Sequence, residues 1–376
     1  MMLVCRSWHQ VIIETPAFWT FVWIGADTGP QAVEGMRLKG VFARSGQLRL
    51  SVMIAPEGIA HFHAVQEAIS DSFQRLGTLS LVGTQKQVQN IPSAEVIQQF
   101  MQHPFPTLKR LNVGNISTSS DPEQSDLVLI MVDSPQLQEL SCHDHFIFPK
   151  SPSHLTSITL TSVHPFPRSP LIPSSFDLPL LLELRLSGCE PSAFLSAFIT
   201  PSLRKLFVID DVPARGPLPP LRPYPTLGEL QWTDRGPDPT FSALIHLFPN
   251  LIRYSNYQMG KEKNIKFQFI DTPAAFLSLL PGEPGDTNGP RTSTWPNLEE
   301  VLLDVGTCDE ISLLIDKIPS LKRVRILRNF MTRADEEAQQ RETRLLPPLR
   351  QRVEVAFWLD PWGSNLGMHF EAEERV

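Results

Sequence analysis

One short phrase recurs along this chain: a proline, one variable residue, a leucine, two variable residues, an apolar residue, one variable residue and a second apolar residue. Clear copies begin at Pro106, Pro135, Pro201, Pro225, Pro296 and Pro319, and looser copies lie around Leu79, Leu160, Pro179 and Pro249. The end of the phrase alternates apolar and variable residues, which is the period of a strand with one buried face. A chain that repeats one short strand is predicted to stack its repeats on one another.

The spacing of the copies narrows the fold class. The first leucines from Leu155 to Leu251 are about 22 to 26 residues apart, inside the roughly 20–29 residues of leucine-rich repeats. Apolar residues three and four apart predict helices between the strands, at 94–101, 193–198, 241–247 and 310–315. The predicted fold is α/β: an irregular leucine-rich-repeat solenoid with parallel strands inside and helices outside, in which Leu203, Leu227 and Leu251 lie in adjacent parallel strands. A generic α/β sheet is the alternative, since its parallel strands also alternate with helices.

The repeats are expected to be irregular. The step from Leu251 to Leu298 is about two repeats, so a degenerate repeat with its strand at 265–269 is predicted between them. The usual leucine-rich consensus places Asn or Cys eight residues after the first leucine, where it can bond backbone groups of neighbouring turns. Here only Asn329 and Cys189 satisfy this, so a continuous asparagine ladder is not expected. Loops are predicted at 213–225 and 282–290, and an exposed helix at 334–344.

Composition excludes several classes of function. A net charge of −7 argues against general binding of nucleic acid or anionic membranes, which needs a basic face. The four cysteines lack CxxC spacing, so neither a disulfide framework nor a zinc module is indicated. The N-terminus lacks the apolar segment of a signal peptide, and no apolar run approaches the roughly 20 residues of a membrane span. The sequence therefore predicts a soluble protein of the cytoplasm or nucleus.

The N-terminal residues carry a family resemblance. Residues 4–19 read V-C-R-S-W-H-Q-V-I-I-E-T-P-A-F-W, which resembles the closing helix of an F-box, where V-C-R-x-W opens the helix and T/S-P-x-L/F-W follows it. Apolar spacing supports a helix with one apolar face, ended by Thr15-Pro16. With the repeats, the chain looks like the F-box/leucine-rich-repeat proteins that are abundant in mushroom-forming fungi. The positions assigned to adaptor binding are Val4, Cys5, Arg6, Trp8, Val11, Ile12, Pro16 and Trp19.

The resemblance implies a function. An F-box docks on a Skp-type adaptor in a cullin–RING ubiquitin ligase, while the repeats hold a substrate. The leading L-P-x-E-[IL]-L helices of the family are missing before Met1, so the F-box is expected to be truncated or partly lost and the chain to bind the adaptor weakly. The alternative is a leucine-rich-repeat scaffold or binding module without a ligase partner, in which the tryptophan-rich N-terminus only caps the solenoid.

Enzymatic chemistry is not indicated. No phosphate loop, nucleophile motif, paired-carboxylate motif or dinucleotide fingerprint is present. His61, His63, His143 and His145 are potential ligands, but two ligands at one place do not make a zinc site. We therefore predict a protein that is not an enzyme and has no metal or cofactor.

The remaining candidate is a surface. In each strand, the second and fourth residues after the first leucine are predicted to point away from the core, onto the inner face. Charges alternate along the second-position row, which is expected either for a mutually neutralising solvated face or for a partner-binding face. Phe207 and Leu302 are apolar among polar neighbours and are predicted to be anchors. The predicted partner-binding residues are Arg185, Lys205, Phe207, Gln231, Arg253, Glu300, Leu302, Arg323 and Arg325.

The predicted division of the chain has three parts. Residues 1–24 form the F-box remnant, residues 25–360 the solenoid and residues 361–376 a tail. The sequence does not identify the substrate.

Overall fold

The computed structural model describes residues 6–25, 31–55, 66–67, 69–81, 94–114, 130–143, 147–163, 175–209, 221–233, 247–256, 296–304, 308–328 and 352–359. Several predictions lie outside these residues: the strand at 265–269, the helix at 334–344, the loop at 282–290 and the tail at 361–376. The chain divides into two compact units, 1–222 and 223–376.

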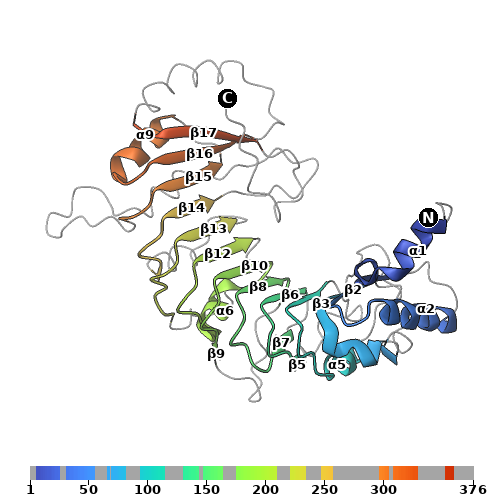
Figure 1. Ribbon diagram of the computed structural model, residues 1–376. Coiled ribbons are helices and arrows are strands. Elements are labelled where there is room, and N and C mark those ends of the chain that lie inside the picture. The colour runs from blue at the N-terminus through green and yellow to red at the C-terminus, as the bar shows by residue number, and fades with distance from the viewer. Residues whose placement is uncertain are drawn as a thin grey trace, which may run out of the picture. The chain divides into compact units, whose positions relative to one another are not determined.

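The first unit is built on parallel strands that lie side by side in chain order (Figure 1). They are β1 (Phe21–Ile24), β2 (Leu50–Ile54), β3 (Leu76–Leu81), β4 (Arg110–Val113), β6 (Glu139–His143), β8 (Ser157–Thr161), β10 (Glu183–Ser187) and β12 (Lys205–Ile209). Each neighbouring pair is parallel. Sequential parallel strands of this kind are consistent with the predicted leucine-rich-repeat-like solenoid.

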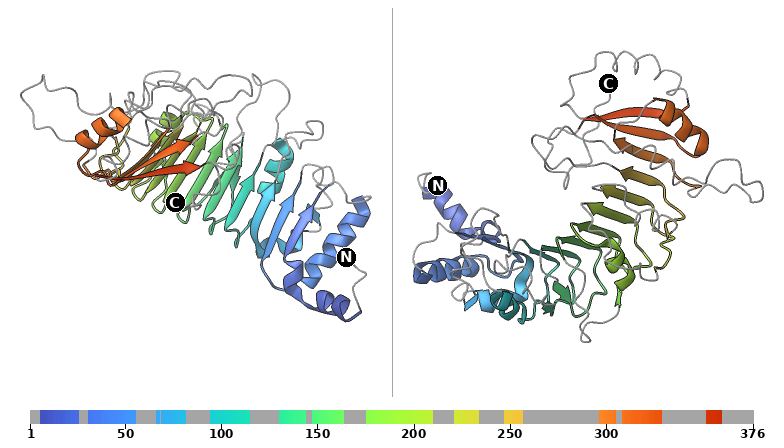
Figure 2. Two further views of the ribbon diagram at one scale, coloured as in Figure 1. Left: turned by 90° about the horizontal axis from the view of Figure 1, so that it is seen from above. Right: turned by 180° about the vertical axis from the view of Figure 1, so that it is seen from behind.

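Helices and short strands cover one face of this sheet. They include η2 (Ser70–Arg75), α5 (Ala94–Met101) and α6 (Pro191–Ala197), together with two parallel pairs, β5 (Ile130–Val132) with β7 (Ile147–Pro149) and β9 (Phe176–Asp177) with β11 (Phe198–Ile199). Figures 1 and 2 show α5, α6, β5, β7 and β9 on the same side of the first unit's sheet. The opposite sheet face is the inner face. Helices α1 (Arg6–Glu14) and α2 (Gln31–Arg44), with η1 (Pro16–Trp19), lie near β1.

The second unit continues the same plan. Its parallel strands are β13 (Glu229–Thr233), β14 (Arg253–Asn256), β15 (Glu300–Asp304), β16 (Arg323–Arg328) and β17 (Glu354–Leu359), and α9 (Cys308–Lys317) precedes β16. One prediction is wrong here: β14 pairs directly with β15, so no strand of a degenerate repeat is inserted between them in the sheet. A long interval in the chain does not require an extra strand, because an inserted segment costs little loop-closure entropy.

The proline of the repeat phrase occupies a β-turn ahead of each strand. Leu108 N–H donates to Phe105 C=O at 3.2 Å and Leu203 N–H to Thr200 C=O at 3.2 Å, with Pro106 and Pro201 at the second turn position, where the ring's φ suits the turn. The first leucine therefore completes the turn and is buried, at 0% exposure for Leu203. This corrects the prediction that Leu203, Leu227 and Leu251 lie within the strands. Their strands begin two residues later, and β13 and β14 are adjacent and parallel as predicted.

The core lies between the strands and the covering layer. The two apolar strand positions of the phrase point into it: Leu184 and Leu206 are 0% exposed, as are Leu230 and Val324 in the second unit. The covering layer contributes aromatic side chains that the repeat phrase did not reveal. In the first unit, for example, the rings of Phe148 and Phe176 lie 4.3 Å apart and those of Phe194 and Phe198 lie 5.9 Å apart.

The N-terminal boundary of the solenoid differs from the prediction. Strand β1 lies inside residues 1–24 and pairs with β2 along its whole length, so the predicted F-box remnant includes the first strand of the sheet. Helix α2 and strand β17 were also not predicted. No helix among the described residues is long and apolar enough to span a membrane.

Candidate functional site

The two inner-face rows predicted from the sequence are rows of neighbouring residues in the sheet. The second-position row pairs Arg110 with Glu139, Glu139 with Ser157, Ser157 with Glu183 and Glu183 with Lys205, and then Glu229 with Arg253, Arg253 with Glu300 and Glu300 with Arg323. The fourth-position row pairs Thr159 with Arg185, Arg185 with Phe207, Gln231 with Ser255, Ser255 with Leu302 and Leu302 with Arg325. The register of the repeat phrase is therefore confirmed on both sides of the strands.

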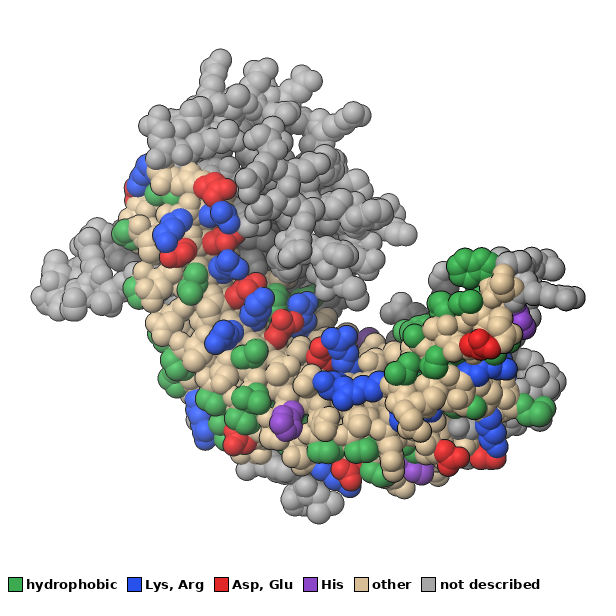
Figure 3. Space-filling model, viewed as in Figure 1, with side chains coloured by type: hydrophobic (Ala, Val, Ile, Leu, Met, Phe, Trp, Pro, Cys, Tyr) green, Lys and Arg blue, Asp and Glu red, His purple; other side chains and the backbone are tan. Residues whose placement is uncertain are grey.

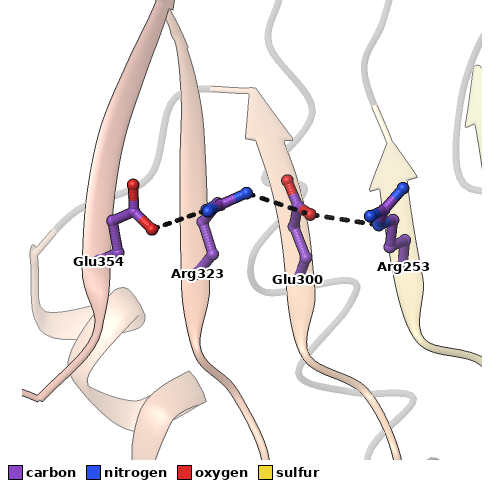
Figure 4. Close-up of polar contacts among 4 residues, drawn as sticks. All are labelled: Arg253, Glu300, Arg323 and Glu354. Carbon is purple, nitrogen blue, oxygen red and sulfur yellow. Dashed lines mark hydrogen bonds and ion pairs between the residues drawn. The ribbon is translucent and has the colours of Figure 1, made fainter. Parts of the chain in front are cut away.

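In the second unit, the second-position row forms a ladder of ion pairs (Figure 4). Glu300 forms ion pairs on two sides, with Arg253 Nε at 3.4 Å and Arg323 Nη1 at 3.8 Å. Arg323 Nε also contacts Glu354 Oε2 at 2.8 Å. The Glu300 side chain is 15% exposed, whereas those of Arg253 and Glu354 are 60% and 61% exposed. Opposite charges at directly opposed strand positions stabilise the pairing of β14 to β17, so this row holds the sheet together as well as facing outward.

We expect Glu300→Gln to lower the free energy of unfolding by about 1 kcal/mol, because it removes the shared acceptor of two partly exposed arginines. Urea denaturation followed by circular dichroism measures the change. Glu354→Gln is the matched control, since that carboxylate is more exposed and accepts from Arg323 at the edge of the ladder, and it should cost less. The difference should shrink in roughly 0.5 M salt. An equal loss in both variants, unaffected by salt, would contradict the ladder's role.

The first unit's inner face contains a second charged cluster. Arg185 Nε lies 2.6 Å from Glu183 Oε1, and its guanidinium carbon lies 4.3 Å from the centre of the Phe207 ring. A cation over an aromatic face is attracted by the ring's quadrupole. Arg110 and Glu139 form a further pair at 3.0 Å, and Lys205 is exposed.

Two predicted binding residues are less accessible than expected. Phe207 stands in the predicted row, but its side chain is 3% exposed, and Gln231 is also 3% exposed. The prediction that Phe207 is an accessible apolar anchor is therefore wrong: strand alternation gives the side of the sheet but not what covers that side. The side chains of Leu302 and Arg325 lie outside the described residues, although their backbone positions are described.

The N-terminal helix presents apolar side chains to solvent. Helix α1 ends before Thr15, and Pro16 opens η1. Trp19 Nε1 donates to Ile12 C=O at 2.8 Å, and the Arg44 guanidinium carbon lies 4.9 Å from the centre of the Trp19 ring, so Trp19 ties η1 to the end of α1. Trp8 and Val11 are 57% and 48% exposed, and Ile12 is half-buried. Val4 and Cys5 lie outside the described residues, as does the side chain of Arg6.

Cys142 and Cys189 are buried structural residues. The Cys189 thiol donates to Leu160 C=O at 3.6 Å and Ser187 C=O at 3.3 Å, which is the bonding to a neighbouring turn expected at that consensus position. Burial raises the pKa of Cys142 to about 12 and the pKa of Cys189 to about 11. Both thiols therefore stay protonated at neutral pH and are poor nucleophiles and metal ligands.

Potential metal ligands do not gather in the described part of the chain. No group of three or more His, Cys, Asp or Glu side chains there could hold a metal ion. His143 lies at the end of β6, while His61, His63 and His145 lie outside the described residues. The absence of a metal or cofactor stays a prediction.

Sequence reasoning missed two features. The residue between proline and leucine in the phrase bonds to the preceding repeat: Thr107 Oγ1 donates to Gln74 C=O at 2.7 Å, Asn250 Nδ2 to Pro225 C=O at 2.9 Å, and Ser320 Oγ to Leu298 C=O at 2.8 Å. The recurring P-[TSN]-L pattern in the sequence could have predicted these hydrogen bonds. The second feature is the exposure of Phe21 and Trp23 on β1, at 60% and 51%.

Comparison with known proteins adds no relative. No family model matches the chain, and no curated protein matches it. Function is therefore inferred from the structure itself: from the parallel repeats, the inner face and the exposed N-terminal helix.

Proposed function

We propose that this chain is a non-enzymatic protein-binding subunit of a Skp–cullin–F-box ubiquitin ligase, in which the repeats hold the substrate. Such a subunit acts in the cytoplasm or nucleus. The observation that carries the proposal is the geometry of α1 and η1, because Trp19 bonds back to Ile12 and leaves Trp8 and Val11 exposed. Large apolar side chains on a helix next to a repeat domain are typical of a docking surface rather than of a cap that serves only the fold.

The inner face supports the substrate-binding part of the proposal. Its rows carry arginine, lysine and glutamate side chains at regular strand spacing, with exposed members such as Lys205 and Arg253. Parallel repeats present such rows as an extended surface, which is the usual way in which solenoids bind other proteins. Arginine is among the residues enriched at the centre of protein interfaces.

Adaptor binding tests the proposal. A purified Skp-type adaptor is passed over three immobilised chains: residues 1–376, the same residues with an L-P-x-E-[IL]-L helical segment fused ahead of Met1, and the fused chain with Trp8→Ala. We expect weak retention by residues 1–376, because α1 offers an apolar strip of a few hundred Å², below the roughly 1,200 Å² of stable interfaces. The fused chain should retain the adaptor, and Trp8→Ala should reduce that retention about tenfold or more.

Leu180→Ala in the fused chain is the control, because Leu180 is 48% exposed but lies in the turn ahead of β10. It should leave adaptor retention unchanged. If the fused chain does not retain the adaptor, or if Trp8→Ala has no more effect than Leu180→Ala, the ligase proposal fails. The chain would then be a repeat scaffold without a ligase partner.

A further inference from the structure

The exposed aromatic side chains of the described residues are confined to one short part of the chain. Trp8, Phe18, Phe21 and Trp23 are each more than half exposed, and Met36 is 67% exposed. The other exposed large apolar residues in the described ranges are aliphatic or methionine. Figure 3 shows hydrophobic side chains gathered over the N-terminal elements, close to basic side chains. Exposed aromatic groups of this size mark interaction sites more often than scattered surface residues do.

Phe21 and Trp23 stand on the inner face of β1. They alternate with Val22 and Ile24, which are 2% and 0% exposed and point into the core. The neighbouring strand places Ser51 opposite Phe21 and Met53 opposite Trp23. The two residues are therefore about 7 Å apart along the strand, and their exposed side chains form a platform at the first strand of the sheet.

The platform is held in place by its surroundings. A Cβ added at Gly25 would lie 2.5 Å from Trp23 Nε1, so the indole rests directly against the Gly25 backbone, in space that only glycine leaves open. Arg37 of α2 donates to Trp23 C=O at 3.2 Å. Fixing a large aromatic group before binding lowers the entropy cost of forming an interface.

The same hydrogen bond decides how a partner can approach. An exposed edge strand usually invites another strand to pair with it. Here Arg37 already donates a hydrogen bond to the Trp23 carbonyl. That carbonyl is one of the backbone acceptors on the free edge of β1 that an added strand would need. A partner is therefore expected to pack on the face of the platform, against the rings.

Charge indicates the chemistry of that partner. Residues 1–55 contain five lysines and arginines and three acidic residues, although the whole chain has a net charge of −7. One of the five, Lys39, is paired with Glu67 at 3.0 Å. Arg49 precedes β2 on the same side as Ser51, the residue opposite Phe21. It is exposed and has no acidic partner among the described residues. Two copies of this positively charged end would repel each other, so the complement is an acidic surface.

We infer that the Phe21–Trp23 platform, with Arg49 at its rim, binds an acidic protein segment that carries an aromatic or long aliphatic anchor. The inference rests on the proposed protein-binding function. It assigns the apolar anchor of that function to Phe21 and Trp23 on the first strand instead of to Phe207. It does not require the adaptor, since that proposal depends on Trp8.

A random dodecapeptide display library, selected on the full chain and counter-selected on the Trp23→Ala/Arg49→Glu variant, tests the inference. Enriched peptides should place two or more Asp or Glu residues around a Trp, Phe, Leu or Met. The best peptide, synthesised with a fluorescein label, should bind the full chain about tenfold or more tighter than it binds Trp23→Ala. Arg49→Glu should also weaken binding, and higher salt should weaken binding to the unchanged chain.

Two matched variants serve as controls. Leu182→Ser changes an exposed apolar residue and Arg204→Glu an exposed arginine, both in the same unit and away from β1, and neither should change peptide affinity. Basic or uncharged enriched peptides, no enrichment over the counter-selected variant, or unchanged affinity in Trp23→Ala would each overturn the inference. Adaptor retention is measured on the same variants. Peptide binding without adaptor binding would refute only the ligase proposal. Adaptor binding without peptide binding would refute only the Phe21–Trp23 site.

Discussion

Leu206→Ala is expected to lower the free energy of unfolding by about 2–5 kcal/mol, because it leaves a cavity in a closely packed core. Leu206 is 0% exposed and is the second residue of β12, opposite Leu184 of β10. Urea denaturation followed by circular dichroism measures the loss. In a stack of repeats each unit contacts only its neighbours, so hydrogen exchange should speed up first in β10 and β12.

Leu182→Ala is the control for this substitution. Leu182 precedes the same β10 strand but is 40% exposed, so its truncation should change stability by no more than about 0.5 kcal/mol. If Leu206→Ala denatures at the same urea concentration as the unchanged chain, the assigned register of the repeat phrase is wrong.

Arg75→Ala should be the next most damaging change, at about 2–3 kcal/mol, because it removes several charge-assisted hydrogen bonds from one place. Arg75, in η2, donates to Phe42 C=O at 3.2 Å, to Leu48 C=O at 3.3 Å and to Gly46 C=O. Phe42 is in the last turn of α2, where carbonyl groups lack partners within the helix and favour a positive charge. Burial lowers the pKa of Arg75, but a guanidinium still remains charged at neutral pH.

Arg75→Lys separates charge from geometry. Lysine keeps the positive charge but cannot reach several acceptors with one planar group, so it should recover only part of the lost stability. Arg204→Ala, at an exposed position, should cost almost nothing. Thermal melting of these variants provides the comparison, and a similar melting temperature for Arg75→Ala and Arg204→Ala would show that Arg75 does not hold α2 to η2.

The sequence predicts the strands well because the repeat phrase carries three signals at once. Proline marks the turn, the first leucine closes it, and the alternation that follows gives the buried and exposed sides of the strand. Leu206 and Arg185 illustrate this, since one is buried and the other stands on the inner face as predicted. Cys189 is another success, because one residue type at a consensus position predicts a bond to the neighbouring repeat.

Other features could not be predicted because they depend on contacts between distant segments. The burial of Phe207 depends on what lies over the inner face, which alternation along one strand does not reveal. The direct pairing of β14 with β15 depends on sheet geometry, whereas spacing in the chain suggested an added strand. Likewise, no local pattern around Arg75 reveals its role, because all of its acceptors except Ser72 Oγ lie about 30 residues earlier in the chain.

The candidate site was predicted in part. The row positions of Arg253, Glu300 and Arg323 follow from the repeat phrase, and the structure adds Glu354 to their ladder. The platform at Phe21 and Trp23 was missed because no leucine of the phrase precedes β1, and Pro16 ahead of it was interpreted only as the end of the N-terminal helix. The sequence of β1 is a continuous run of four apolar residues, and such a run does not distinguish a half-exposed strand from a fully buried one.

A calorimetric titration of the purified Skp-type adaptor into the fused chain tests the central claim, that the exposed face of α1 docks this repeat protein on a ligase. We expect saturable binding with a Kd of about 1 µM or tighter, the range of specific stable interfaces. Trp8→Ala should weaken binding about tenfold or more, and Trp23→Ala should leave it unchanged. Absence of binding by the fused chain, or equal affinity of the Trp8→Ala variant, would contradict the claim.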